Sequence, residues 1–387
     1  MRLYVAKMLT GLLAAGLCLS GITEAAPLIE DVQPIAKSAV LIEAHSGRVL
    51  FEHNAHKRTP MASTTKIMST LLALEHGDLD TPFVVEADAI RTEGSSMGLQ
   101  AGDTVTLRAL CYGMMLPSGN DAANAAAVRV AGSVPDFVAL MNRKAAELGL
   151  QNTSFATPSG LDGENHYSSA YDMAMLTREA MKNPDFAEIT AAKRVKLSYG
   201  NPPYDRWLTN HNRLLDGSDG VIGGKTGFTE KSGRCLVSVA KREGVTLICA
   251  TLGAADDWNL HRKLYNKGYE LLEPVDLSRY TEGLGVDVTG GAAQKVGAIL
   301  QPPGLLTLTA EEAALLQVEV RVPPFVYAPV EQGDLLGEVV CTVGEVVVFT
   351  QSLLAAEEVA LAHPEKQPFS LWRWISGLLK GIFTKEN

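Results

Sequence analysis

The sequence has few cysteines and no excess of basic residues. Its 34 Lys and Arg residues stand against 44 Asp and Glu residues, for a formal net charge of −10. No basic stripe is present, which argues against a nucleic-acid-binding protein. The cysteines beyond residue 25 match no zinc motif in their spacing, so we expect no zinc site. Buried free thiols are the expected state of these four residues: Cys111, Cys235, Cys249 and Cys341.

The composition is that of a folded protein. Hydrophobic residues make up 46% and charged residues 20% of the 387 positions, as in ordinary globular proteins. A chain of this length has room for two or three domains.

Residues 1–25 have the pattern of a secretory signal peptide. Arg2 and Lys7 supply a positive start, an apolar run follows over residues 8–19, and Thr23 and Ala25 place small residues before a cleavage point. An uncleaved signal anchor is the alternative, although the apolar run is short for a membrane span. The pattern therefore predicts an exported protein.

Residues 364–387 comprise a linker and an amphipathic stretch. From Phe369 to Phe383, Trp, Phe, Leu and Ile fall on one helical face and Arg and Lys on the other. The stretch is too short and too charged to span a bilayer. A basic face opposite an aromatic and aliphatic face is typical of a helix lying in the membrane interface. A helix docked on the protein's own body is the alternative.

Two regions of different character lie between these ends. Residues 27–275 mix helical and strand-like stretches, which predicts an α/β (α+β) domain with an antiparallel sheet and a helical subdomain. Residues 276–363 are rich in short strand-like runs, which predicts a small all-β domain; the runs include Lys295–Leu300, Leu305–Leu308 and Val318–Val322. In the first domain the strand-like runs are Ser38–Ile42, Arg48–Glu52, Lys225–Thr229, Arg234–Ala240 and Val245–Leu252, and the helical stretches are Leu107–Leu116, Val134–Leu148, Ser169–Met181 and Asn259–Leu272.

One predicted helix brings together a serine and a lysine. Pro60 suits the first turn of a helix, and the stretch up to Gly77 is apolar over most of its circumference, so the helix is expected to be buried. Ser63 and Lys66 are three residues apart and share one face of the first turn. Burial lowers the pKa of a lysine, and a neutral amine can take a proton from a serine hydroxyl. The pair is therefore a candidate nucleophile and base.

The same spacing recurs at Ser238 and Lys241. That stretch alternates like a strand, in which residues three apart point to opposite faces. We therefore expect no catalytic pair there.

Two further motifs lie at breaks in the pattern. Pro117 and Gly119 interrupt a helix, so Ser118 and Asn120 lie on a tight connection, where a plain helix cap is the alternative role. The stretch Lys225-Thr226-Gly227 begins a three-strand meander. Glycines flanking a lysine on a strand predict close approach of another chain segment or a ligand to the backbone.

In their order, these three motifs resemble the S-x-x-K, S-x-N and K-T-G set of penicillin-binding proteins and serine β-lactamases. The chain as a whole resembles the low-molecular-mass penicillin-binding proteins that act as D-alanyl-D-alanine carboxypeptidases. The resemblance covers nearly the full length and includes the stretches 210–215 and 223–229. It implies a penicillin-binding/β-lactamase-like fold for the first domain. It also implies that the protein acts at the outer face of the cytoplasmic membrane.

The resemblance also implies roles for individual residues and requires no metal or cofactor. The substrate would be a peptidoglycan stem peptide ending in D-Ala-D-Ala, and β-lactam antibiotics would acylate the same serine and leave slowly. The implied roles are Ser63 as nucleophile, Lys66 as general base, Ser118 as proton relay, Asn120 as holder of the substrate amide, Lys225, Thr226, Gly227 and Thr229 as the substrate-binding strand, and the backbone N–H groups of Ser63 and Phe228 as the oxyanion hole.

Three other functions remain to be weighed. Class A β-lactamases use an added Glu for deacylation, and no E-x-x-L-N-like stretch follows Asn120, since Glu147 and Glu164 do not match it. A transpeptidase or endopeptidase would use the same residues. A non-catalytic cell-wall binding protein would not need them intact. The function expected is therefore a carboxypeptidase of peptidoglycan maturation and cell shape, with the spore cortex as one candidate wall.

Overall fold

The computed structural model describes residues 27–217, 219–301 and 304–362. The predicted signal peptide and the amphipathic stretch lie outside these residues. The chain divides into two compact units. The first ends at Pro274 and also takes in Thr307–Ala310, while the second contains the rest of the C-terminal part.

The first unit is built on a five-stranded antiparallel sheet of order β2-β1-β9-β8-β7. Alternate residues of β1 point to opposite faces, and each face is buried. Val40 and Ile42 belong to one hydrophobic core, and Ala39 and Leu41 belong to another. The strands are β1 (Ser38–Glu43), β2 (Val49–His53), β7 (Val221–Thr229), β8 (Gly233–Arg242) and β9 (Val245–Leu252).

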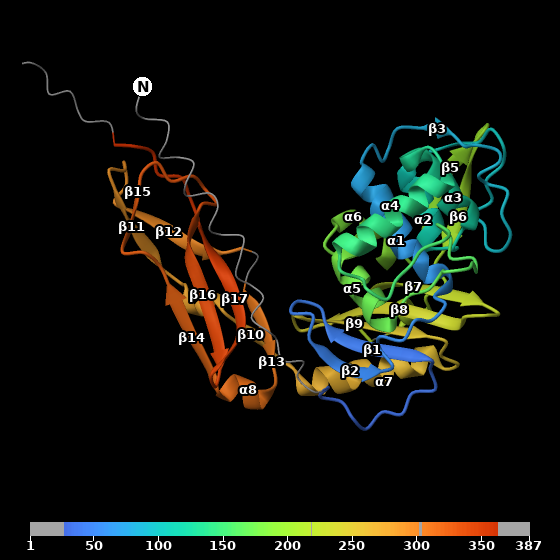
Figure 1. Ribbon diagram of the computed structural model, residues 1–387. Coiled ribbons are helices and arrows are strands. Elements are labelled where there is room, and N and C mark those ends of the chain that lie inside the picture. Colours follow the sequence, from blue (N-terminus) through green and yellow to red (C-terminus); the bar gives the residue numbers. More distant parts are fainter. Residues whose placement is uncertain (1–26, 218, 302–303, 363–387) are drawn as a thin grey trace, which may run out of the picture. The chain divides into compact units, whose positions relative to one another are not determined.

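Helices cover both faces of this sheet (Figure 1). The helix α7 (Asp257–Leu271) lies on one face, and the other helices form a subdomain on the opposite face. Four of them begin at a side chain that accepts a backbone N–H from the first turn; the capping residues are Thr106, Ser133, Ser169 and Asn183. The subdomain consists of α1 (Lys66–His76), α2 (Leu107–Met115), α3 (Asn120–Ala131), α4 (Val134–Glu147), α5 (Ala170–Ala180) and α6 (Pro184–Ala191).

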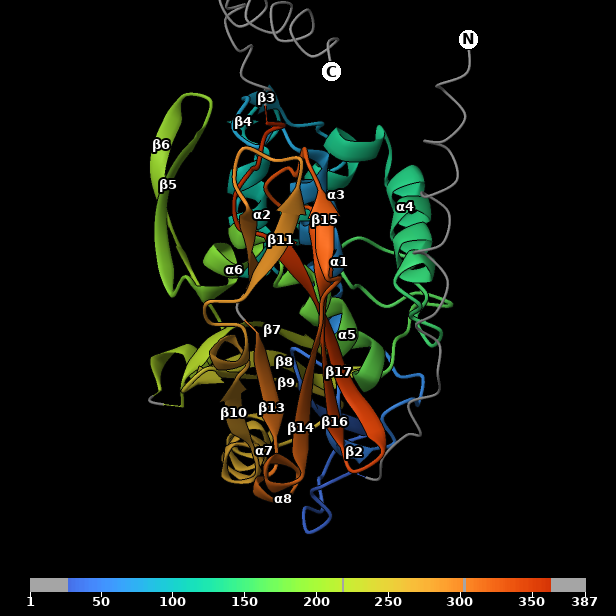
Figure 2. The ribbon, with the colours of Figure 1, turned by 90° about the vertical axis from the view of Figure 1, so that its left-hand side faces the viewer.

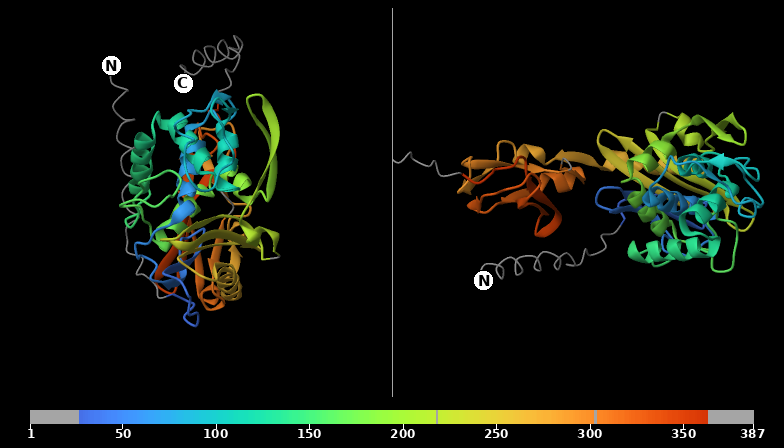
Figure 3. Two further views of the ribbon diagram at one scale, coloured as in Figure 1. Left: turned by 90° about the vertical axis from the view of Figure 1, so that its right-hand side faces the viewer. Right: turned by 90° about the horizontal axis from the view of Figure 1, so that it is seen from above.

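A two-stranded ribbon stands apart from the sheet. The strands β5 (Arg194–Gly200) and β6 (Pro203–Thr209) form an antiparallel hairpin that extends along one side of the helical subdomain (Figures 2 and 3). No strand was predicted there, although residues 194–199 alternate between polar and apolar side chains. A second small sheet pairs β3 (Phe83–Val84) with β4 (Thr104–Val105).

The second unit contains a six-stranded sheet of order β14-β16-β17-β12-β11-β15. Its strand pairs are antiparallel except for β11 and β15, which run parallel. The strands are β11 (Gly285–Thr289), β12 (Lys295–Leu300), β14 (Leu316–Arg321), β15 (Phe325–Tyr327), β16 (Leu335–Val343) and β17 (Val346–Ala355).

The remaining elements lie where the chain passes between the units. The strands β10 (Glu273–Asp276) and β13 (Leu305–Leu308) pair with each other, and α8 (Ala310–Ala314) is a short helix. The predicted all-β second domain is therefore confirmed. Among the described residues, no helix is both long enough and apolar enough to cross a membrane.

Candidate active site

Ser63 lies in a single turn of 3-10 helix, η1 (Ala62–Thr65), and Lys66 is the first residue of α1. The hydroxyls of Thr64 and Thr65 donate to the carbonyl oxygens of Met61 and Ala62, at 2.6 and 2.8 Å, and so hold the turn. The helical turn therefore begins at Ala62, and the prediction that Pro60 occupies it was wrong by two residues. The shared face of serine and lysine is retained.

Three oxygen atoms surround the Lys66 amine, which has no exposed surface. Its Nζ lies 2.9 Å from Ser63 Oγ, 2.7 Å from Asn120 Oδ1 and 2.5 Å from the carbonyl oxygen of Ser159. Burial, followed by the nearby charge of Lys225, brings the pKa of Lys66 well below its ordinary value, while Asp121 acts weakly in the opposite sense. Burial therefore favours the neutral form of the amine.

A neutral amine has two N–H groups and one lone pair. The two carbonyl oxygens carry no proton, so they accept the N–H groups, and the lone pair faces the Ser63 hydroxyl. Of the three groups bonded to Lys66 Nζ, only the Ser63 hydroxyl can donate a proton. This geometry suits Lys66 to act as a general base for Ser63.

The connection between α2 and α3 carries the second motif. Ser118 has a φ of 63°, and α3 begins at Asn120 behind Gly119, with no side-chain cap. The alternative of a plain helix cap was therefore wrong. The Asn120 Nδ2 donates to the Glu93 carbonyl at 2.7 Å, so its amide is fixed with Oδ1 toward Lys66 and one N–H left over. Within the described chain, the Ser118 hydroxyl makes no hydrogen bond, so it is available to another group.

The third motif lies on β7, against the turn that carries the serine. A Cβ on Gly227 would be 2.9 Å from the Ser63 backbone nitrogen and 3.1 Å from that of Thr64. Only glycine leaves room for this approach, so the predicted close contact of the strand backbone is confirmed. On the other side of the turn, a Cβ on Gly160 would lie 2.0 Å from the Ala62 carbonyl oxygen. No sequence pattern indicated this contact.

Lys225 is fully buried, and its Nζ donates to the Thr226 carbonyl oxygen at 2.9 Å. Burial lowers the pKa of Lys225 to about 7. Phe228 is 66% exposed, so its side chain lies at the protein surface. The Thr229 hydroxyl lies 2.9 Å from Ser232 Oγ and accepts the Ser232 N–H at 3.0 Å, so it also holds the turn between β7 and β8.

A histidine that the sequence analysis did not single out supports the serine turn. His166 Nε2 lies 2.9 Å from Thr65 Oγ1, and its Nδ1 accepts the Ala156 N–H at 2.9 Å. Burial lowers the pKa of His166 to about 4, so the ring is neutral with its proton on Nε2. No local pattern marked this residue, because its partner lies 101 positions away in the sequence.

Two other expectations can be compared with the structure. Ser238 is buried in β8 and lies 2.7 Å from both His261 Nδ1 and Tyr265 Oη, whereas Lys241 is exposed, so this pair is not a second site. All four cysteines of the described part are buried and free, as expected.

In the same part of the chain, no cluster of three or more His, Cys, Asp or Glu residues could hold a metal ion.

Two protein families match successive parts of the chain. Residues 23–256 match the family described as D-alanyl-D-alanine carboxypeptidase. Residues 261–361 match the C-terminal domain of penicillin-binding protein 5. Together the two matches cover both units of the structure.

Individual proteins give the same result. The chain is similar to the D-alanyl-D-alanine carboxypeptidase DacF of Bacillus subtilis, at 35% identity over 84% of this chain and 85% of that protein. It is similar in structure to the carboxypeptidase DacD of Francisella tularensis, with a TM-score of 0.64 and 26% identity over 87% of this chain and 96% of the other. A variant of the Streptomyces K15 DD-transpeptidase has a TM-score of 0.60 and 30% identity, over 62% of this chain and all of the other.

Proposed function

Because the chain belongs to the D-alanyl-D-alanine carboxypeptidase family, we propose that it removes the terminal D-alanine from peptidoglycan stem peptides. Members of this family are serine-type peptidases that act through an acyl-enzyme and bind penicillin. The observation that carries the proposal is the placement of the buried Lys66 amine, 2.9 Å from the Ser63 hydroxyl and bonded to two carbonyl oxygens.

In the acylation step, Ser63 Oγ attacks the carbonyl carbon of the penultimate D-alanine and its proton passes to Lys66 Nζ. The carbonyl oxygen becomes an oxyanion, which accepts hydrogen bonds from the backbone N–H groups of Ser63 and Phe228. Each such donor contributes about 3 kcal/mol to transition-state stabilisation in comparable sites. The close approach of Gly227 to the Ser63 nitrogen supports this pairing.

Collapse of the tetrahedral intermediate breaks the C–N bond and releases D-alanine. The leaving nitrogen takes the proton that Lys66 received from Ser63, passed on through the Ser118 hydroxyl, which makes no other hydrogen bond within the residues described. Water then attacks the acyl-enzyme and gives a proton to Lys66, which passes it to Ser63 Oγ as the ester bond breaks and the shortened peptide leaves. The free N–H of Asn120 would hold the substrate amide during both steps.

Substrate recognition would take place along β7. This strand is at the edge of the five-stranded sheet, so half of its backbone groups have no strand partner, and an extended peptide can add there. Protonated Lys225 would supply positive potential, and the hydroxyls of Thr226 and Thr229 would bind the terminal carboxylate.

A transpeptidase is the second candidate, favoured by the structural similarity to the K15 DD-transpeptidase. Both activities share the acyl-enzyme and differ in the acceptor, which is water in one and an amine in the other. Product analysis separates them. Incubation of a D-Ala-D-Ala pentapeptide with and without glycine should give free D-alanine and the tetrapeptide in both cases. A glycine adduct as the main product would favour transfer.

The nucleophile can be tested by intact-protein mass after incubation with a β-lactam. We expect one adduct on the wild type, no adduct on Ser63→Ala, and an unchanged adduct on Ser238→Ala, which alters the second S-x-x-K match. Absence of an adduct on folded wild-type protein would refute the acyl-enzyme and favour a non-catalytic cell-wall binding protein.

We also propose that the protein acts outside the cytoplasm, at the outer face of the cytoplasmic membrane, with residues 1–25 as export signal and residues 364–387 as peripheral anchor. The support is the sequence pattern of the two ends, together with related cell-wall enzymes such as DacF. Removal of residues 364–387 should shift the exported protein from the membrane to the soluble fraction. An unchanged distribution would contradict the anchor.

A further inference from the structure

The loop of residues 93–103 contacts the catalytic centre through Asn120. The Glu93 carbonyl accepts the Asn120 Nδ2 at 2.7 Å, and the Ser95 carbonyl accepts the Asn120 backbone N–H at 2.7 Å. A Cβ on Gly94 would lie 2.9 Å from Asn120 Nδ2. The loop therefore fixes the orientation of the amide whose other end bonds Lys66. Met97 within the loop is only 5% exposed.

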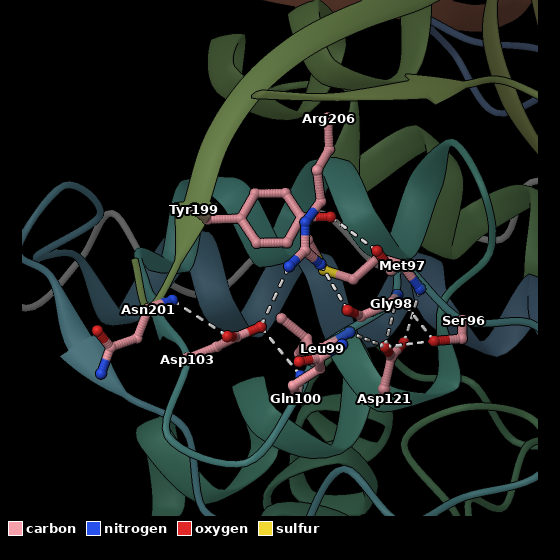
Figure 4. Close-up of polar contacts among 10 residues, drawn as sticks. All are labelled: Ser96, Met97, Gly98, Leu99, Gln100, Asp103, Asp121, Tyr199, Asn201 and Arg206. Atoms are coloured by element: carbon pink, nitrogen blue, oxygen red, sulfur yellow. Dashed lines mark hydrogen bonds and ion pairs between the residues drawn. The ribbon is translucent and has the colours of Figure 1, made fainter. Parts of the chain in front are cut away.

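The carboxylate of Asp121, the residue after Asn120, holds this loop from the inside. It accepts the backbone N–H groups of Met97, Gly98 and Leu99 at 2.9, 3.1 and 3.0 Å, and the hydroxyl of Ser96 at 2.6 Å (Figure 4). Asp121 is 2% exposed. Four donors on one buried carboxylate fix the shape of the loop from Ser96 to Leu99.

The β5–β6 hairpin holds the same loop from the outside. The Arg206 guanidinium donates to the Gly98 carbonyl at 2.5 Å and pairs with Asp103 at 3.4 Å (Figure 4). The Tyr199 hydroxyl donates to the Met97 carbonyl at 2.7 Å. Asp103 in turn accepts the backbone N–H groups of Gln100 and Asn201, at 2.9 and 3.2 Å, and so links loop to hairpin.

Aromatic rings hold the arginine in place. Its Cζ lies 4.2 Å from the centre of the Tyr199 ring and 4.1 Å from that of the Tyr204 ring, which are paired across the hairpin. The Arg206 side chain is only 10% exposed and Asp103 is 6% exposed. Little solvent screens this ion pair, so the contact is stronger than a typical surface pair.

We propose that Tyr199 and Arg206 are positioning residues of the active site, which hold loop 93–103 so that Asn120 keeps the Lys66 amine directed at Ser63. The hairpin is thereby part of the catalytic architecture, although neither residue touches the reacting atoms. The effect expected on the reaction rate rests on the proposed function. The inference extends that function by assigning a task to a hairpin that carries none of the three motifs.

The hairpin offers matched controls. Arg194 stacks on Trp207 at 4.1 Å just as Arg206 stacks on its tyrosines, but in the described structure it does not contact the loop. Tyr204 packs on Arg206 as Tyr199 does, but its hydroxyl makes no hydrogen bond there. The informative pairs are therefore Arg206→Leu against Arg194→Leu, and Tyr199→Phe against Tyr204→Phe.

The measurement is the rate of acylation by a chromogenic β-lactam, together with kcat and KM on a D-Ala-D-Ala peptide. Arg206→Leu should lower the acylation rate by about 10- to 100-fold, because small misplacement of reacting groups has effects of this size. Tyr199→Phe should lower it by about 3- to 10-fold, the effect of one lost hydrogen bond. The loss should appear mainly in kcat, with a smaller rise in KM because Asn120 also holds the substrate amide, and Arg206→Lys should recover part of it. Both control variants should match the wild type.

A structural readout independent of activity accompanies the kinetics. In Arg206→Leu, amide hydrogen exchange should accelerate at residues 93–99 and at Asn120, and remain unchanged in β7. Equal rates and equal exchange in Arg206→Leu, Tyr199→Phe and the two controls would overturn the inference. If Arg206→Leu does not fold, the Tyr199→Phe pair decides. If the wild type forms no adduct, the proposed function fails, and the exchange result still decides whether the hairpin holds the loop.

Discussion

Replacement of Gly227 by alanine tests the geometry of the site more directly than removal of a catalytic side chain, because it leaves every such side chain in place. The new Cβ would lie 2.9 Å from the Ser63 nitrogen, and 3.1 Å from both the Ala62 Cβ and the Thr64 nitrogen. The first distance is shorter than real Cβ contacts allow, so β7 must move away from the serine turn. Both proposed oxyanion donors, on Ser63 and Phe228, would then separate.

We expect this substitution to lower the rate of acylation more than it lowers the stability of the fold. Overpacking of this kind destabilises a fold by about 1–3 kcal/mol. Loss of one oxyanion donor lowers the rate by about 10²–10³-fold. We therefore expect Gly227→Ala to remain folded at 25 °C, with acylation by a β-lactam slowed by about 10²–10³-fold.

Stopped-flow acylation and urea denaturation of the same preparation provide the two readouts. The control is Gly285→Ala, another strand glycine, whose added Cβ would meet no atom closer than 3.6 Å. It should leave both quantities unchanged. A Gly227→Ala protein that is acylated at the wild-type rate would refute the close approach of β7 and, with it, the proposed oxyanion hole.

Further predictions concern pH and packing. The proposed mechanism needs a neutral Lys66 and a charged Lys225, so kcat/KM should fall in acid as Lys66 takes a proton, and fall in alkali as Lys225, with a pKa of about 7, loses one. Lys225→Arg should abolish the alkaline fall and leave the acid fall in place. A wild-type profile with no alkaline fall would contradict this role of Lys225. The unfolded chain protonates His166 near its ordinary pKa of 6.5 but the folded protein only near a pKa of about 4, so stability should fall as pH drops between these values. The loss should reach up to about 3 kcal/mol in denaturant titrations and be absent from His166→Gln. Gly160→Ala would place a Cβ 2.0 Å from the Ala62 carbonyl oxygen, at a residue with a φ of 91°. It should therefore lower the free energy of unfolding by at least about 3 kcal/mol. An unchanged thermal midpoint would contradict this and show that the serine turn can shift freely.

The sequence by itself determined the chemistry and much of the secondary structure. Spacing along one helix turn placed Ser63 beside Lys66, because residues three apart share a helix face. The same kind of local geometry separated this pair from Ser238 and Lys241, which lie on a strand. The bounds of β12 and β13 agreed residue for residue with the predicted strands, since their alternation reflects one buried face and one exposed face.

The tertiary structure alone decided what surrounds the lysine and what holds the site in shape. The Ser159 carbonyl that bonds Lys66 comes from 93 residues further along the chain. Glu93 lies 27 positions from Asn120, His166 lies 101 positions from Thr65, and the hairpin residue Arg206 lies 108 positions from Gly98. Each of these contacts involves a residue of an irregular loop, and such contacts leave no periodic pattern, because the packing of whole elements brings the partners together. The motifs identify the reacting groups, and the packing of distant segments sets their orientation.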